Sequence, residues 1–116
     1  MTAQKIFEMK FADVYPLLRQ KAERKGRTAK EADQLTEWLT GYNEEQIAAL
    51  LNSEITYGDF FRQAPAPNPD RLKIRGSICR VKIQEIEDPL MHDIRCLDKL
   101  IDDLAKGKSF NKILPE

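Results

Sequence analysis

Cysteine, histidine and net charge are all scarce in this sequence, and each shortage excludes a class of protein. The two cysteines, Cys79 and Cys96, are too few for a disulfide framework and are typical of a reducing compartment. A single histidine, His92, leaves little for conventional acid–base catalysis. The 19 basic and 19 acidic residues cancel, which argues against a protein that coats nucleic acid or a membrane surface.

Long apolar runs and recognised catalytic motifs are also missing. No run approaches the roughly 18 residues needed to cross a bilayer, and the N-terminus lacks the apolar segment of a secretory signal. The five glycines are isolated, so there is no glycine-rich phosphate loop, and neither G-x-S-x-G nor H-E-x-x-H occurs. We therefore expect a cytoplasmic protein with no membrane contact, cofactor or metal.

The clearest element that is present is a helix over Asp88–Gly107. Asp88 is a good N-cap, Pro89 fits the first helical position, and Gly107 fits the left-handed position after the last turn. Between these ends runs an apolar stripe with spacings of four and three: Leu90, Ile94, Leu97, Ile101 and Leu104. This stripe predicts the main core element of a single domain that spans residues 1–116.

Shorter helices are predicted in the first half of the chain. A first helix begins at Phe11 or Asp13, and Pro16 is compatible with it only if the start is near Asp13. Capping residues at Thr28, Asn43 and Thr56 predict three further helix starts. The alternation in residues 5–11 predicts a short strand or extended arm before them.

The strongest strand pattern lies in residues 72–86, where apolar and charged residues alternate. The apolar positions change parity across Gly76 and Ser77, which indicates either a two-residue hairpin turn or a bulge there. We favour the hairpin. The predicted fold is therefore α+β and mainly helical: several short helices and a long C-terminal helix packed with a small antiparallel β-hairpin.

Five cations without an intervening acid form the main candidate site: Arg71, Lys73, Arg75, Arg80 and Lys82. Like charges on neighbouring strands repel, so the group needs acidic partners or an anion. Nearby carboxylates, including Glu85 and Asp93, could make it an ordinary solvated face. The alternatives are a site for phosphate groups or nucleic acid, and repulsion relieved by a partner protein.

Three other groups on the sequence have a functional and a structural interpretation. His92 and Cys96 share a helix face and could bind zinc or form a nucleophile, but a helical wheel places both opposite the apolar stripe, as surface residues. Asp98, Asp102 and Asp103 could hold a cation, but are expected to be a solvated face partly paired by Lys99 and Lys106. A second basic group surrounds the Gly26 turn at the end of the first predicted helix, where the helix dipole favours cations in the last turn: Arg19, Lys21, Arg24, Lys25, Arg27 and Lys30.

Several segments resemble a known family: residues 38–42, Ala64-Pro65, Asn68-Pro69, residues 85–91 and residues 97–108. They resemble the bacterial domain-of-unknown-function family twenty-two hundred. The resemblance covers nearly the whole chain and implies a stand-alone bacterial cytosolic protein with no known activity, cofactor or catalytic residue. The family usually has glycine at Arg80, glutamate at Gln84 and an aromatic residue at Cys96, which argues against a function built on Arg80 or Cys96.

The functional prediction is a small cytosolic binding or interaction module without enzymatic activity. The alternatives are an anion or nucleic-acid binder that uses the basic hairpin Arg71–Lys82, and an enzyme of unrecognised type. The partner is undefined by the sequence; it could be another protein, or a second copy bound through exposed Leu100 or Met91, whereas nucleic acid is less favoured.

Overall fold

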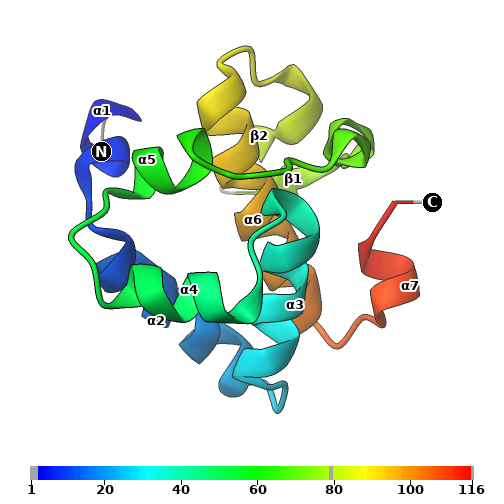
Figure 1. Cartoon of the computed structure of the whole chain (residues 1–116). Coiled ribbons are helices and arrows are strands. Elements are labelled where there is room, and N and C mark those ends of the chain that lie inside the picture. The colour runs from blue at the N-terminus through cyan, green and yellow to red at the C-terminus, as the bar shows by residue number, and fades with distance from the viewer. Residues whose placement is uncertain (1–2, 79, 116) are drawn as a thin grey trace.

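A computed structural model describes residues 3–78 and 80–115, which form helices and one small hairpin (Figure 1). The first half contains α1 (Ala3–Glu8), α2 (Phe11–Glu23), α3 (Ala29–Thr40), α4 (Glu44–Leu51) and α5 (Tyr57–Arg62). The second half contains the 3₁₀ helix η1 (Pro69–Lys73), strands β1 (Ser77–Ile78) and β2 (Val81–Lys82), the 3₁₀ helix η2 (Ile83–Glu85), α6 (Pro89–Ala105) and α7 (Phe110–Ile113). This architecture confirms the mainly helical α+β prediction.

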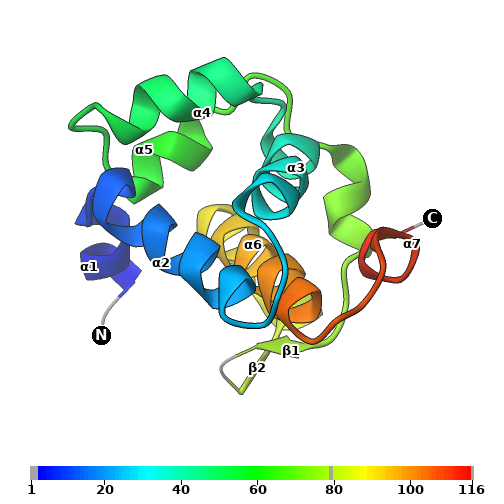
Figure 2. The same ribbon diagram turned by 90° about the horizontal axis from the view of Figure 1, so that it is seen from below.

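Helix α6 lies at the centre of this arrangement and packs against α2, α3, α5, α7, β1 and η2 (Figure 2). Its 17 residues give a length of about 26 Å, close to the 27 Å of the shortest molecular dimension. The Asp88 carboxylate accepts from the backbone N–H of Leu90 at 3.0 Å, as the N-cap prediction requires. Four of the five stripe residues are buried and Leu90 is half-buried, so the predicted core element is confirmed.

The three helix starts predicted from capping residues in the first half are also confirmed. Thr28 and Glu31 form a reciprocal capping box at α3, and Asn43 and Gln46 form another at α4. The Thr56 side chain accepts from the backbone N–H of Asp59 at 3.1 Å and so starts α5. These contacts link residues three apart in sequence, which is why the local pattern predicts them.

The predicted strand in residues 5–11 is wrong. The segment forms α1 and the start of α2, and its extended geometry is limited to an isolated bridge between Lys10 and Thr56. Phe7 lies against Gly58 of α5, where a Cβ atom would come within 3.0 Å of the Phe7 Cβ. Packing of α1 against α5 therefore overrides the short alternating pattern.

Helix α2 begins at Phe11, the earlier of the two predicted starts. Pro16 therefore lies in its second turn, and the expectation that this proline requires a start near Asp13 is wrong. The Phe11 N–H donates to the carbonyl of Ile55 at 3.0 Å, and the Phe11 ring stacks on Phe60 with centroids 4.1 Å apart. These tertiary contacts fix the helix start and outweigh the local preference of proline.

The proline-rich segment after α5 is anchored to the end of α3. Backbone N–H groups of Ala66 and Asn68 donate to the carbonyls of Thr40 and Leu39, each at 3.0 Å. Gly41 ends α3 with φ +82°, and a Cβ atom there would lie 2.7 Å from the Ala66 Cβ and 2.8 Å from its backbone nitrogen. Glycine is required both for the left-handed turn and for this close approach.

Gly41→Ala should therefore destabilise the protein more than Gly26→Ala. Both glycines have nearly the same φ, +82° and +84°, but a Cβ at Gly26 meets no atom within 4 Å. We expect Gly26→Ala to lower the free energy of unfolding by about 1–2 kcal/mol, from backbone strain alone. Gly41→Ala should lower it by about 1–3 kcal/mol more, because of the clash. Urea unfolding of the two variants measures the difference; equal losses would show that the segment is not held against α3.

The β-hairpin is shorter than predicted and turns at a different place. Its strands pair antiparallel, with Ser77 opposite Lys82 and Ile78 opposite Val81, so the turn follows Ile78 instead of lying at Gly76-Ser77. Both interpretations of Gly76-Ser77, hairpin turn and bulge, are therefore wrong, and Cys79 lies outside the described residues. Arg80 has φ +67°, a left-handed conformation in which glycine is easier to accommodate, and this suits the glycine usual in the family that the sequence resembles.

Residues 72–74, predicted as strand, belong to η1 or follow it. The Asn68 side chain accepts from the backbone N–H of Asp70 at 2.9 Å, and Pro69 occupies the first turn. These local contacts start a 3₁₀ helix in place of the strand. Across the described residues, every helix is too short or too polar to cross a membrane.

Candidate functional site

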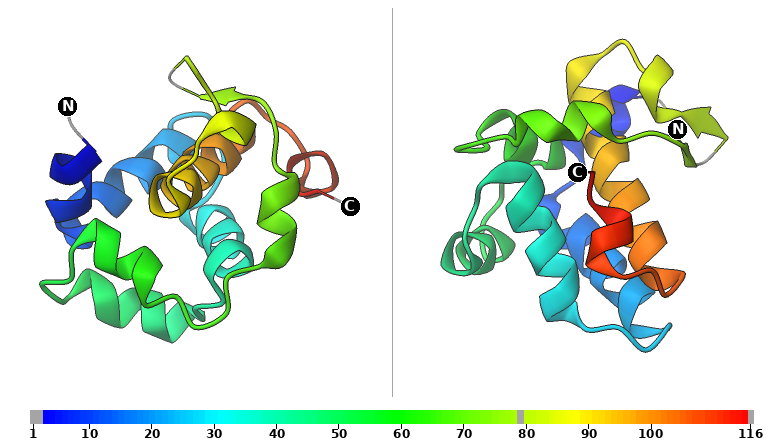
Figure 3. Two further views of the ribbon diagram at one scale, coloured as in Figure 1. Left: turned by 90° about the horizontal axis from the view of Figure 1, so that it is seen from above. Right: turned by 90° about the vertical axis from the view of Figure 1, so that its right-hand side faces the viewer.

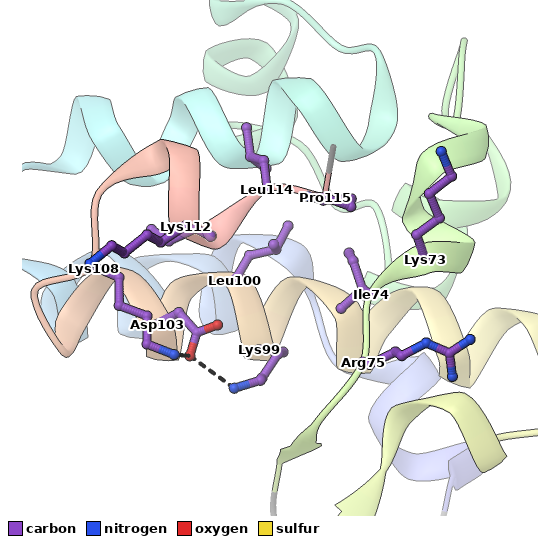
Figure 4. A pocket seen from close by; sticks show the side chains of 11 residues that line it. Lys73, Ile74, Arg75, Lys99, Leu100, Asp103, Lys108, Lys112, Leu114 and Pro115 are labelled. Carbon is purple, nitrogen blue, oxygen red and sulfur yellow. Dashed lines mark hydrogen bonds and ion pairs between the residues drawn. The ribbon is translucent and has the colours of Figure 1, made fainter.

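A basic pocket lies where the segment after η1, the second half of α6 and the C-terminal segment meet. In Figures 2 and 3, α7 lies beside η1 and along the end of α6. The pocket has a volume of about 250 Å³ and five cationic lining residues, Lys73, Arg75, Lys99, Lys108 and Lys112. Asp103 is the one acidic side chain among its described lining residues, so positive charge dominates the pocket (Figure 4).

One end of the pocket is organised around the Asp103 carboxylate. Lys99 precedes Asp103 by four residues on α6, so both share a helix face, and the Lys99 Nζ donates to Asp103 Oδ1 at 2.9 Å. The turn after α6 brings Lys108 back to the same oxygen at 3.3 Å. Two lysines thus share one buried carboxylate oxygen, which leaves this end with excess positive charge even before Lys112 is included.

The other end is formed by the residues between η1 and β1. Lys73 pairs with Asp70 at 3.2 Å. Arg75 is exposed, and within residues 3–78 and 80–115 no carboxylate lies within ion-pair distance of it. Arg75 therefore provides most of the uncompensated charge at this end.

The structure divides the five cations that the sequence grouped together. Lys73 and Arg75 line the pocket. Arg71 instead donates to the Asp93 carboxylate at 2.9 Å and to the Asn68 carbonyl at 2.9 Å, so its charge is used in holding η1 against α6. Arg80 and Lys82 lie on the hairpin, outside the pocket lining, and Lys82 lies 3.9 Å from Glu85.

Cys96 is not a surface residue, so its predicted placement is wrong. Its side chain is fully buried, and its Sγ lies 3.9 Å from the Arg71 carbonyl and 3.7 Å from the ring nitrogens of half-buried His92. The helical wheel assumed one buried face of α6, whereas η1 covers the opposite face as well. Burial raises the pKa of the Cys96 thiol to about 12, so the sulfur remains protonated at neutral pH.

The three aspartates considered as a cation site, Asp98, Asp102 and Asp103, all have basic partners. Asp98 pairs with Arg95 at 3.0 Å, and Asp102 pairs with both Lys21 and Lys106. The pairing by Lys99 and Lys106 is as predicted, but Asp103 is buried, not solvated. Among the described residues, no three histidine, cysteine or acidic side chains converge as a metal site.

The second basic group is partly used in packing between helices. Arg19 forms two hydrogen bonds with Asp33 of α3. Arg27 pairs with Glu31 at 2.8 Å and also donates to the carbonyls of Leu104 and Lys108. It therefore caps the carbonyl end of α6, a structural role.

Leu100 is 1% exposed and forms part of the pocket floor, so it offers no surface for self-association. Three pocket cations were absent from the predicted site: Lys99, Lys108 and Lys112. The four-residue spacing of Lys99 and Asp103 and the turn at Gly107 are visible in the sequence. Their closeness to Arg75 is not, because it depends on how the C-terminal segment folds back.

Comparison with known proteins identifies the family but assigns no activity. A family model described as an uncharacterized protein conserved in bacteria (DUF2200) matches residues 5–115. The crystal structure of uncharacterized protein SP1917 matches with 54% sequence identity and a TM-score of 0.92, covering 97% of this chain and 92% of that one. No curated protein matches. Since the family model covers almost the entire sequence, the chain belongs to the DUF2200 family of uncharacterized bacterial proteins.

Proposed function

We propose that this protein binds a small anionic ligand in the pocket between η1, α6 and α7. The observation that carries the proposal is that five cationic side chains from separate segments meet around one pocket, where Asp103 is the one acidic residue among the described lining residues. Cations held this close repel one another unless counter-charges are present, and Asp103 offsets only part of the charge. An anion in the pocket would relieve the remaining repulsion.

The size and chemistry of the pocket support a small ligand. Its volume of about 250 Å³ is below the roughly 300–1,000 Å³ of pockets for drug-sized molecules. Lysine and arginine bind carboxylates and phosphates through charge-assisted hydrogen bonds, and arginine can form two at once. A compact carboxylate or phosphate compound matches both properties.

Inorganic phosphate is the first probe, titrated at low ionic strength into isotopically labelled protein and followed by amide NMR shifts. We expect perturbations in residues 73–76, 99–103 and 108–114, and weaker binding as salt rises. Arg75→Gln should weaken the affinity at least tenfold, because a hydrogen bond to a charged group contributes about 1.5–3 kcal/mol.

Arg80→Gln is the matched control, since Arg80 is also an exposed cation of the same basic run but does not line the pocket. It should leave the affinity unchanged. Shifts that gather at residues 77–82, or a larger effect of Arg80→Gln than of Arg75→Gln, would instead locate the site on the hairpin. No phosphate-dependent shift at low salt would refute the proposed function.

Nucleic-acid binding is the competing outcome of the same experiment. A single-stranded oligonucleotide that occupies only the pocket should be displaced by phosphate and lose affinity in Arg75→Gln. An oligonucleotide that binds equally well to Arg75→Gln at saturating phosphate would indicate a separate nucleic-acid surface and contradict the small-anion proposal.

As part of this proposal we assign the protein to the cytoplasm. Cys96 is a free, buried thiol, and proteins with few cysteines and no disulfide framework are typical of reducing compartments.

A further inference from the structure

The carboxylate of Asp103 has one oxygen that receives no donor from the described part of the chain. Lys99 Nζ and Lys108 Nζ both contact Oδ1, at 2.9 Å and 3.3 Å, and no hydrogen bond from residues 3–78 or 80–115 reaches Oδ2. In Figure 4 this second oxygen points away from Lys108. Among the same residues, Tyr57 Oη is the one side-chain polar atom that is both sealed from solvent and unpartnered. Asp103 Oδ2 is therefore open to the pocket that Asp103 lines, and it can accept a hydrogen bond from a bound molecule.

The two lysines at this carboxylate also have donors to spare. Each ammonium group carries three N–H donors and uses one of them on Oδ1. Because both Nζ atoms contact the same oxygen, they are no farther apart than the sum of the two contact distances, and one oxyanion can accept from both. Two positive charges against one carboxylate leave this end of the pocket attractive to an anion.

Lys99 is held in this position by the chain around it. Its side chain is 13% exposed, and a Cβ atom at Gly76 would lie 2.9 Å from the Lys99 Cε and 3.5 Å from its Nζ. The stem of Lys99 therefore lies against Gly76, while its ammonium group reaches Asp103. This contact places the segment that contains Arg75 beside the Asp103 end of the pocket.

An anion bound by these two lysines lies beside a carboxylate of the same sign. Two negative groups at one site repel each other, and the repulsion is relieved when one of them carries a proton. An oxyanion with its own O–H group can donate a charge-assisted hydrogen bond to Asp103 Oδ2. An oxyanion without a proton presents only acceptors, so Asp103 disfavours it.

We propose that the ligand is an oxyanion that keeps a hydroxyl group at neutral pH, represented by hydrogen phosphate, and that Asp103 selects it. The hydroxyl group donates to Asp103 Oδ2, and the other oxygens accept from Lys99 and Lys108. This inference rests on the anion-binding function proposed above and specifies its ligand class. Asp103 is then a residue that determines specificity as well as a counter-charge for the lysines.

Titration with phosphate and with sulfate at pH 8 and equal ionic strength tests the proposal, followed by the amide NMR shifts of the pocket residues. Both anions are tetrahedral and mostly doubly charged at this pH, but only phosphate keeps a proton. We expect phosphate to bind at least tenfold more tightly than sulfate. Methyl phosphate, whose dianion has no hydroxyl group, should bind like sulfate. This third titration separates free phosphate from phosphate esters as the ligand.

Asp103→Asn removes the negative charge at nearly constant volume and should bring the ratio of phosphate affinity to sulfate affinity close to one. Asp102→Asn is the matched control, because Asp102 is the neighbouring residue of α6 but pairs with Lys21 and Lys106 and does not line the pocket. It should preserve the ratio. Circular dichroism checks that both variants fold, and the comparison of the three anions in the unmodified protein depends on neither variant.

The possible failures are distinguishable. If phosphate, sulfate and methyl phosphate bind in the pocket with equal affinity, the anion-binding function stands and selection by Asp103 is wrong. A preference for phosphate that persists in Asp103→Asn, or that shifts amides outside the pocket, also overturns this selection. If none of the three anions perturbs pocket amides, both proposals fail.

Discussion

Replacing Leu97 by alanine should lower the free energy of unfolding by about 3–5 kcal/mol, the upper part of the range for large-to-small core changes. Leu97 is fully buried near the middle of α6, the helix that contacts most of the other elements. The change removes buried apolar surface and leaves a cavity that the surrounding helices cannot easily fill. Urea unfolding followed by Trp38 fluorescence and circular dichroism measures the loss, with coincident transitions as evidence of cooperative unfolding.

Leu17→Ala is the matched control for this prediction. Leu17 also lies within a helix, but its side chain is 60% exposed, so the same substitution should change stability by less than about 0.5 kcal/mol. Similar losses for the two variants would contradict the central position of α6 in the core.

Asp33→Ala should lower the free energy of unfolding by about 3 kcal/mol, because it breaks a mostly buried charge network between α2 and α3. Asp33 Oδ1 accepts from the Tyr15 hydroxyl at 2.7 Å and from Arg19 Nε at 3.0 Å, and Asp33 Oδ2 accepts from Arg19 Nη2 at 2.7 Å. Burial raises the pKa of the Tyr15 phenol, so this hydroxyl remains a donor throughout the neutral range. Removal of the carboxylate leaves both donors without this acceptor.

A double-mutant cycle and an exposed pair separate this network from a surface effect. The double variant with Arg19→Met and Asp33→Ala should lose less free energy of unfolding than the two single variants together. The difference should be at least about 1 kcal/mol. Asp59→Ala breaks the more exposed ion pair with Arg62 and should cost less than about 1 kcal/mol. Strict additivity in the cycle would show that Arg19 and Asp33 are not coupled.

The burial of Asp33 illustrates what the helical pattern predicts and what it omits. The spacing of Leu35 and Leu39 predicts the inner face of α3, and both residues are buried. Nothing local shows that Tyr15 and Arg19 of α2 lie opposite Asp33. A polar residue can be buried only where such partners meet it, and that condition is set by the packing of two helices.

Cys96 shows the same limit on α6. Periodicity identifies the strongest apolar face of α6, and the burial of Ile94, Leu97 and Ile101 confirms it. A helix surrounded by other elements is buried on more than one face, and in a single sequence that second face has only a weak signal. The sequence pattern therefore places Cys96 on the surface, although it is part of the core.

The pocket is the clearest case of a site that the sequence describes only in part. Arg75 was among the predicted anion-binding residues and lines the pocket, whereas Arg71 is paired with Asp93. Proximity in sequence grouped Arg75 with Arg80, but the three-dimensional structure groups it with Lys99 and Lys112.

The amino-acid sequence by itself determined where α3, α4, α5 and α6 begin, because capping contacts join residues two or three positions apart. Asp88, Thr28 and Asn43 each accept a hydrogen bond from a backbone N–H within that range. Only the tertiary structure decided the ends of the hairpin, the second buried face of α6 and the composition of the basic pocket. Those features depend on contacts between segments distant in sequence, which form only when the chain packs around α6.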